Sequence, residues 1–358
     1  MRVALSDFTL YLTQECNLDC RYCFQKRRAQ SLDFSTIREA LDFFQDSIEE
    51  SGYVTFYGGE PLLEFDTIAR TVDFIETHKT LNAKKLRYNI SVNGTLLTEE
   101  ILEFLSRHRF KVNLSHDGTA QDMTRPSHLN SLVWENLARL IRLPDIELET
   151  NSVFIPATVK EVFRSARLLV ESGIKNCQLS YSIGDPWDSV CLAQMREEVQ
   201  ELRRYLLSYY YQHRSIPVQN FQNRLSPGLF QCAAGQDRLA LGPDGKLWGC
   251  RFFADLFSAG VAHHELSAYC FGDIRDFATN DEAVYSAAIQ KYKALRQENF
   301  SSEKRACRDC PDILLCSACP ATAAFSTGLL GKIPDWICDL KKIWREEVAR
   351  FWAEAASG

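Results

Sequence analysis

The sequence predicts an α/β fold: a partial (βα)6 barrel of the TIM type followed by a smaller cysteine-rich domain. Two observations favour it. Through the first two hundred residues, short β-rich runs alternate with amphipathic helical stretches, giving six such units. Helices between successive strands favour parallel pairing with right-handed crossovers. From about residue 217 onward the alternation stops, and the chain becomes punctuated by Gly, Pro and Cys.

Each βα unit is recognised by a short β-rich run followed by an apolar stripe of helical period. In order, the strand and helix pairs are predicted at 8–12 and 34–48, 53–57 and 62–78, 88–92 and 98–108, 110–114 and 132–143, 146–154 and 159–172, and 177–182 and 193–211. Further on, Pro243-Asp244-Gly245 predicts a hairpin turn, and 344–352 has the pattern of an amphipathic helix. At 358 residues the chain has room for two domains, which we place at 1–215 and 216–358.

Charge and hydrophobicity disfavour several classes of partner. The formal net charge is −6, from 41 Lys and Arg against 47 Asp and Glu, so the chain lacks the basic surplus that drives binding to nucleic acid. No uncharged run of eighteen or more apolar residues occurs, and no charged-then-apolar signal segment follows Met1. We expect a cytoplasmic protein with neither nucleic acid nor a membrane as its partner.

Thirteen cysteines carry most of the functional information. In a reducing compartment, clustered thiols point to metal or redox chemistry rather than to disulfides. The first group, Cys16-x3-Cys20-x2-Cys23, lies in the loop after the first predicted strand. Thiolate sulfur suits Fe–S clusters or zinc, and three ligands leave one iron of a cubic cluster open to a small molecule. A structural zinc site, or three buried cysteines, are the alternatives.

The loops after the next three predicted strands also carry unusual residues. Because the carboxyl ends of parallel strands meet at one rim of a barrel, we expect these loops to converge with the cysteine loop. Two adjacent glycines let a backbone approach a ligand closely, and a carboxylate pairs with a cation. The segments are Gly58-Gly59-Glu60-Pro61, Asn93-Gly94-Thr95 and Ser115-His116-Asp117-Gly118.

Taken in order, the cysteine triplet and the Gly-Gly-Glu-Pro run resemble the two signature motifs of radical S-adenosylmethionine (SAM) enzymes. The resemblance implies that Cys16, Cys20 and Cys23 hold a [4Fe–4S] cluster whose fourth iron chelates SAM. It also implies that the loop at 58–61 receives the methionine amino group, with Glu60 accepting from the ammonium.

Further positions are similar to the SAM contacts of that family. They are Asn93, Ser115, Asp117 and Arg125, while Tyr22 either stacks near the adenine or merely packs. Two positions depart from the family pattern, because His116 stands where Leu is usual and Gln121 where His is usual.

The C-terminal cysteines resemble the SPASM extension, which holds two auxiliary [4Fe–4S] clusters. By that resemblance Cys307, Cys310, Cys316 and Cys338 ligate an outer cluster, and Cys232, Cys250 and Cys319 ligate an inner one. The inner set is one cysteine short, so its fourth ligand is Cys270, a non-cysteine side chain or the substrate. Paired C-x2-C units are also typical of zinc ribbons, which is the alternative interpretation.

The resemblance implies an oxidoreductase that uses three [4Fe–4S] clusters and SAM to modify a ribosomally made precursor peptide. We expect an oxidative crosslink, through a C–C, C–O or thioether bond, with a flavodoxin or ferredoxin as reductant. The alternatives are sulfatase-maturase-like side-chain oxidation, dehydrogenation of a small alcohol or sugar, and a non-catalytic zinc or Fe–S scaffold.

Sulfatase maturases carry an acid directly after the cysteine equivalent to Cys250, where this chain has Arg251. No catalytic base is assigned, although Asp244, Asp255 and Tyr269 lie near the inner-cluster segment.

Overall fold

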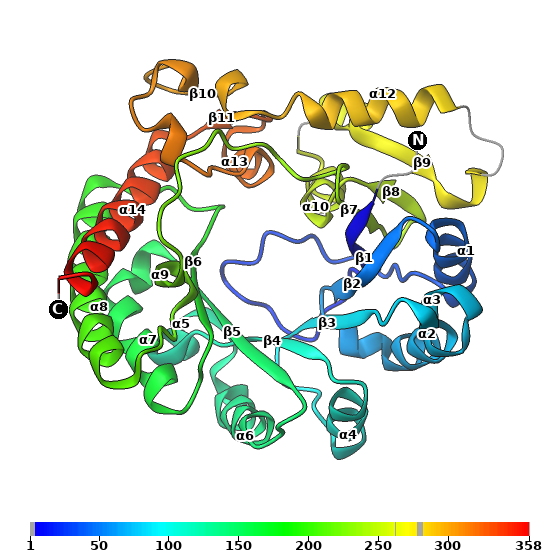
Figure 1. Cartoon of the computed structure of the whole chain (residues 1–358), viewed down its shortest axis with the longest axis horizontal. Coiled ribbons are helices and arrows are strands. Elements are labelled where there is room, and N and C mark those ends of the chain that lie inside the picture. The colour runs from blue at the N-terminus through cyan, green and yellow to red at the C-terminus, as the bar shows by residue number, and fades with distance from the viewer. Residues whose placement is uncertain (1–3, 262, 278–281, 358) are drawn as a thin grey trace.

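The computed structural model describes residues 4–261, 263–277 and 282–357, and it confirms the predicted α/β class. Nine strands form one sheet in the order β6-β5-β4-β3-β2-β1-β7-β8-β9. All pairs from β6 to β7 are parallel, and the strands form an open arc with helices on its outside (Figure 1). The six barrel strands are β1 Leu5–Thr13, β2 Ile48–Gly58, β3 Arg87–Val92, β4 Lys111–Ser115, β5 Glu147–Phe154 and β6 Cys177–Tyr181.

The helices of this half follow the strands as predicted, with local signals that fix their starts. The Asp33 carboxylate accepts from the Thr36 N–H at 2.9 Å and begins the first helix, and the Thr98 hydroxyl does the same for a later one. The helices are α1 Phe34–Phe44, α2 Phe65–Thr77, α3 Lys79–Ala83, α4 Glu99–Arg107, α5 Gln121–Thr124, α6 Asn130–Ile141, α7 Val162–Glu171 and α8 Ser189–His213.

The predicted boundary between the first helix and the second strand is wrong. The helix predicted at 34–48 ends at Phe44, and the strand predicted at 53–57 already begins at Ile48. Ile48 is 1% exposed and pairs with Leu5 of β1. A single apolar residue such as Ile48 fits the pattern of a helix and that of a strand equally well. Its pairing with β1 makes it part of the strand.

The sheet buries an apolar row that runs across four barrel strands. Leu10, Phe56, Ile90 and Val112 are in register on β1, β2, β3 and β4, and each is fully buried. Side chains alternate between the two faces of a strand, so the next residues, Tyr11 and Tyr57, lie on the opposite face. The face with the tyrosines is the one that carries polar chemistry.

The C-terminal half extends the same sheet. β7 (Arg238–Leu241) pairs in parallel with β1, and β8 (Lys246–Trp248) and β9 (Cys270–Asp273) add to it antiparallel. The turn between β7 and β8 contains Pro243-Asp244-Gly245, which confirms the predicted hairpin. The remaining elements are α9 Gln219–Gln222, α10 Arg251–Ala259, α11 His263–Leu266, α12 Glu282–Lys293, α13 Pro320–Thr327, α14 Asp335–Ala355, β10 Ser301–Ser302 and β11 Lys332–Ile333.

The end of the chain returns to the barrel. The helix predicted at 344–352 is the second half of the longer α14, which packs against α8 (Figure 1). Glu347 of α14 is fully buried and forms an ion pair with Arg203 of α8 at 2.9 Å. The sheet is continuous across residue 215, and the division into two domains there stays a prediction. Among the residues described, no helix combines the length and apolar character needed to cross a membrane.

Candidate active site

The loop between β1 and α1 crosses the space enclosed by the arc of strands and carries the first three cysteines (Figure 1). Its two ends are tied together, since the Gln14 N–H donates to the Gln30 carbonyl at 3.1 Å. Burial raises the pKa of Cys16, of Cys23 and of Cys20, the last to about 11. Negative charge at Cys16 and Cys23 adds to the rise at Cys20, so the three thiols are electrostatic neighbours. Metal ligation by such thiols must displace their protons.

The two glycines at 58–59 fit this loop against the end of β2. A Cβ on Gly58 would lie 2.7 Å from the Thr13 carbonyl oxygen, and one on Gly59 would overlap the Glu15 carbonyl group. The Gly59 and Glu60 N–H groups donate to those same carbonyls at 2.8 and 2.9 Å. The sequence predicts that these glycines let the backbone approach a ligand. In the structure, the backbone that they approach is that of the cysteine loop.

Glu60 is a buried carboxylate, 1% exposed, directly after the glycines. Its Oε2 accepts from the Asn93 N–H at 2.7 Å and its Oε1 from the Leu62 N–H at 3.1 Å. Burial raises the pKa of Glu60 to about 7, although both hydrogen bonds and the charge of Arg125 act to lower it. In the described part of the chain Glu60 forms no ion pair, so a ligand cation would stabilise it. Pro61 follows and opens a short 3₁₀ turn.

Asn93 links the rim to the cysteine loop. Its Nδ2 donates to Asn17 Oδ1 at 2.8 Å and lies 3.9 Å from Cys16 Sγ, while its Oδ1 accepts from the Thr95 N–H at 3.0 Å. The loops after β1, β2 and β3 therefore converge as predicted.

Asp117 and Arg125 form a buried ion pair at this rim. Arg125 Nε donates to Asp117 Oδ2 at 3.0 Å, and Asp117 Oδ1 accepts from the Val153 N–H at 2.8 Å. Arg125 also donates to the Tyr22 hydroxyl, and its guanidinium lies 5.4 Å from the centre of the Tyr22 ring. The acceptors of Asp117 are thus engaged within the protein, and Asp117 orients Arg125. Ser115, half-buried, is the last residue of β4.

The two departures from the family pattern have structural partners here. His116 is fully buried, and its Nδ1 accepts from the Gly118 N–H at 3.0 Å. The centres of the His116 and Trp134 rings are 4.2 Å apart. Burial lowers the pKa of His116 to about 4, so the ring is neutral. The Gln121 side chain accepts from the Asp117 N–H at 2.8 Å. Both residues support the loop that presents Asp117.

The C-terminal cysteines gather in two groups. Burial raises the pKa of Cys232 to about 11 and of Cys250 to about 12, and the charge of Cys319 contributes to both. Burial likewise raises the pKa of Cys307 to about 11 and of Cys338 to about 12, with contributions from Cys310 and Cys316. The structure thus brings together the same two sets that the resemblance implies, and their role as cluster ligands stays a prediction.

Other residues lie close to these two sets. Cys270 sits on β9, where its thiol lies 3.8 Å from the Leu247 carbonyl oxygen. Gln297, 1% exposed, donates from Nε2 to Cys316 Sγ at 3.2 Å. Tyr181 and Lys341 interact electrostatically with both Cys316 and Cys319, so they lie near these two cysteines. Gln297 was not found from the sequence, because it lies outside every cysteine motif.

A second polar network lies beside the cysteine loop. The Asp255 carboxylate, 1% exposed, accepts from Gln25 Nε2 at 3.1 Å and from the Tyr57 hydroxyl at 3.4 Å. Burial raises the pKa of Asp255 to about 6, and Tyr11 is a further hydrogen-bonding partner. Cys23 interacts electrostatically with Asp255, so this carboxyl group is close to the first cysteine set. The sequence indicated Asp255 only through its distance from Cys250 and gave no signal for Gln25.

In the described ranges, no three His, Cys, Asp or Glu side chains are close enough together to hold a single metal ion. A cubic cluster spreads its ligating sulfurs around four irons and needs a wider spacing than one ion does.

Comparison with known proteins agrees with this geometry. Residues 10–187 match the Radical SAM superfamily model. Radical SAM cyclopropyl synthase TigE of Paramaledivibacter caminithermalis is 29% identical over 126 residues, which cover 30% of this chain and 26% of that protein. This match spans 26% of the length of TigE, and a match to MJ0907 of Methanocaldococcus jannaschii spans 41% of that protein.

Solved structures match nearly the whole chain. The anaerobic sulfatase-maturating enzyme anSMEcpe with bound AdoMet superposes with a TM-score of 0.76 at 17% identity, over 98% of this chain and 95% of the other. SuiB of Streptococcus suis bound to its precursor peptide SuiA gives a TM-score of 0.58 at 15% identity, over 91% and 75%. At these identities the match shows the fold, and a SPASM-like C-terminal domain is consistent with it. From its motifs, its site and the family match, residues 10–187 form a radical SAM domain, and the chain is an enzyme of the radical SAM superfamily.

Proposed function

We propose that this chain is a peptide maturase that oxidatively crosslinks a ribosomally made precursor peptide by radical SAM chemistry. The observation that carries the first half of the proposal is Glu60. A buried carboxylate without a paired cation in the described structure, hydrogen-bonded to Asn93 beside the cysteine loop, suits the ammonium group of SAM.

The residues around Glu60 would each bind or orient a different part of the cluster and SAM. Cys16, Cys20 and Cys23 would hold the [4Fe–4S] cluster, Glu60 would take the ammonium of SAM, and Asn93 would fix Glu60 to the cysteine loop. Arg125, oriented by Asp117, places a positive charge beside Cys20 and Tyr22. Gly58, Gly59 and Pro61 shape the loop, and Ser115 lines the same rim. When bound, the cluster and SAM supply a 5′-deoxyadenosyl radical that takes a hydrogen atom from the substrate.

The two C-terminal cysteine sets would each hold an auxiliary [4Fe–4S] cluster, which gives three clusters in all. Their chemistry is the acceptance of a second electron, so that the overall reaction is an oxidation. Asp255 is the carboxyl group best placed to accept the accompanying proton. It is buried near the first cysteine set, and its pKa of about 6 lets it exchange a proton near neutral pH. A flavodoxin or ferredoxin would deliver the first electron.

Peptide crosslinking is supported by the proteins this chain resembles, since one is a cyclopropyl synthase and another was solved with its precursor peptide. A second candidate is side-chain oxidation of the sulfatase-maturase kind, favoured by the match to anSMEcpe over nearly the whole chain. Arg251 stands against it, because its guanidinium covers the Tyr57 ring at 4.4 Å where those enzymes place an acid.

The test is an anaerobic turnover assay. Iron-loaded protein is incubated with SAM, dithionite and the peptide encoded beside its gene, and the peptide is analysed by mass spectrometry. We expect a product lighter by two hydrogen atoms whose fragmentation shows a link between two residues. A product oxidised at one side chain without a link would favour sulfatase-maturase-like chemistry, and an unchanged peptide would contradict peptide modification.

A matched set of variants tests the cluster assignment. Replacing Cys16, Cys20 and Cys23 together by Ala should abolish 5′-deoxyadenosine formation, while most of the absorbance of the other clusters remains. Cys191→Ala is the control, since Cys191 is partly buried outside all three sets. Wild-type protein should contain about twelve irons per chain. Persistent 5′-deoxyadenosine formation in the triple variant would rule out the assignment.

A further inference from the structure

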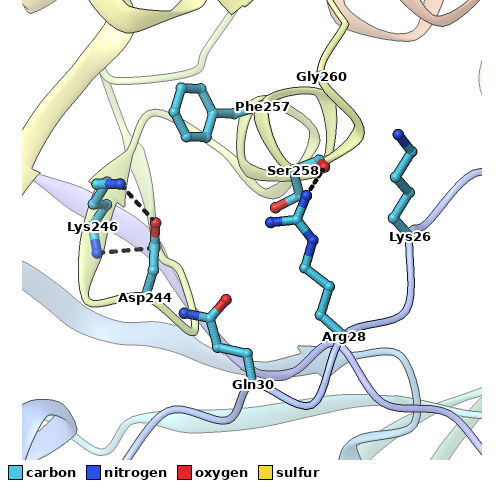
Figure 2. A pocket seen from close by; sticks show the side chains of 8 residues that line it. All are labelled: Lys26, Arg28, Gln30, Asp244, Lys246, Phe257, Ser258 and Gly260. Carbon is cyan, nitrogen blue, oxygen red and sulfur yellow. Dashed lines mark hydrogen bonds and ion pairs between the residues drawn. The ribbon is translucent and has the colours of Figure 1, made fainter.

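A cavity of about 380 Å³ lies between the cysteine loop and the C-terminal half of the chain (Figure 2). One wall is the stretch of the loop that carries Lys26 and Arg28. The other walls are the β7–β8 hairpin, with Asp244 and Lys246, and the end of α10, with Phe257 and Ser258. The volume falls within the range of about 300–1,000 Å³ that is usual for sites that bind organic ligands, and it exceeds what a bare ion needs.

The cavity is cationic, although the whole chain is not. Asp244 is the only acidic residue among those that line it, and its Oδ2 already pairs with Lys246 Nζ at 3.1 Å. Lys26 and Arg28 therefore leave a formal charge of +2 on the lining, on a chain whose net charge is −6. The local field in a partly enclosed cavity acts on a ligand more strongly than the distant surface charges, which salt screens.

Arg28 is held in place for binding. One of its Nη atoms donates to the Ser258 carbonyl at 2.9 Å, at the end of α10, and the Ser258 hydroxyl accepts from Gln14 Nε2 at 2.6 Å. A guanidinium has five N–H donors, so anchoring one of them leaves a preoriented fork for a carboxylate. Figure 2 shows Lys26 and Arg28 on the side of the cavity away from the hairpin, with the Arg28 guanidinium pointing toward Ser258.

We propose that this cavity binds an acidic residue of the peptide substrate, with its carboxylate between Lys26 and Arg28. This inference rests on the proposed function and names the substrate class for it: a peptide with Asp or Glu close to the modified residue. Lys26 follows Cys23 by only three residues, so their Cα atoms are at most about 11 Å apart. An acidic residue held there would fix the register of the peptide at the cysteine loop.

The test measures peptide binding to the iron-loaded, full-length protein. The probes are a fluorescein-labelled octapeptide, Gly-Asp-Glu-Gly-Ser-Asp-Glu-Gly, and its counterpart with Asn and Gln in place of the acids, followed by fluorescence anisotropy at low salt. We expect the acidic probe to bind about tenfold more tightly or better, and to weaken as salt is added. The variants K26E/R28E and K26Q/R28Q should both remove the preference.

The control is K160E/R164E, which makes the same change of charge on two exposed residues, one just before α7 and one in its first turn, and should keep the preference. Equal binding of both probes, or a preference that survives K26E/R28E, would overturn the proposal. Inorganic phosphate that displaces the acidic probe at equal concentration would also overturn it, since the cavity would then be a general anion site. The turnover assay with the peptide encoded beside the gene reports on the proposed function separately, so the two can fail independently.

Discussion

At the scale of single residues, the role proposed for Glu60 would link its protonation to SAM binding. Its pKa of about 7 in the ligand-free protein means that near neutral pH half of the molecules carry a neutral acid there, because burial disfavours the charge. Only the carboxylate pairs with an ammonium group, so we expect SAM affinity to rise with pH. Between pH 6 and pH 8 the ionised fraction grows about tenfold, and the affinity should follow it.

The measurement is the Kd of SAM for iron-loaded protein at pH 6, 7 and 8. Glu60→Gln should bind weakly at all three values and lose the pH dependence, whereas Glu39→Gln, an exposed residue of α1, should behave as wild type. A flat pH profile in the wild type would show that Glu60 does not meet the ammonium.

Gln297 gives a second prediction at this scale. Its amide donates to Cys316 Sγ at 3.2 Å, and a hydrogen bond to a ligating sulfur stabilises the reduced, more negative state of a cluster. Gln297→Leu should therefore lower the reduction potential of the proposed outer cluster by about 20–60 mV, which is about 0.5–1.5 kcal/mol for one electron. Redox titration followed by EPR measures it. Gln290→Leu, on the exposed face of α12, should leave the potential unchanged.

At the scale of elements, the junction of β1, β2 and the cysteine loop depends on Gly59. A Cβ there would overlap the backbone of Glu15, which no rotation of a side chain relieves. Gly59→Ala should move the cysteine loop and cost roughly a third of the bound iron, because one of the three proposed clusters would lose its site. Gly184→Ala is the control, since a Cβ at Gly184 meets nothing within 4 Å. Full iron content with normal SAM binding in Gly59→Ala would contradict this account.

The elements also mark what the sequence could and could not predict. The six βα units were predictable because each strand is short and rich in strand-forming residues, which alternate with polar ones in β3 and β4, and each helix has an apolar stripe. The start of β2 at Ile48 was not, because it depends on pairing with Leu5, more than forty residues away. The convergence of the loops with Cys16, Glu60 and Asn93 follows from parallel topology. The engagement of Asp117 with Val153 does not, since it needs the side-chain geometry.

At the scale of the whole molecule, the two halves are joined twice. The sheet runs from β6 to β9 without a break, because β7 pairs with β1 after more than two hundred residues of chain. On the far side of the arc, α14 packs against α8 (Figure 1). The cysteine motifs predicted the C-terminal half but not this arrangement, since a long-range strand pair leaves no periodic signal in the sequence.

The packing of α14 against α8 includes a buried charge. Glu347 of α14 is fully buried, and its carboxylate is shared by Arg203 of α8 and Arg350, each at 2.9 Å. Arg203→Met would leave the carboxylate with one partner, and removing one member of a buried pair typically costs about 3–5 kcal/mol of unfolding free energy. Urea unfolding of iron-loaded protein should show that loss, while R167M, which breaks an exposed pair within α7, should change stability by less than about 0.5 kcal/mol.

The double variant R203M/E347L should recover most of the loss, because it removes the buried charge as well as its partner. If R203M is no less stable than R167M, the closure of the chain end onto the barrel does not depend on this pair, and apolar contacts such as Phe351 with Phe221 must hold it instead.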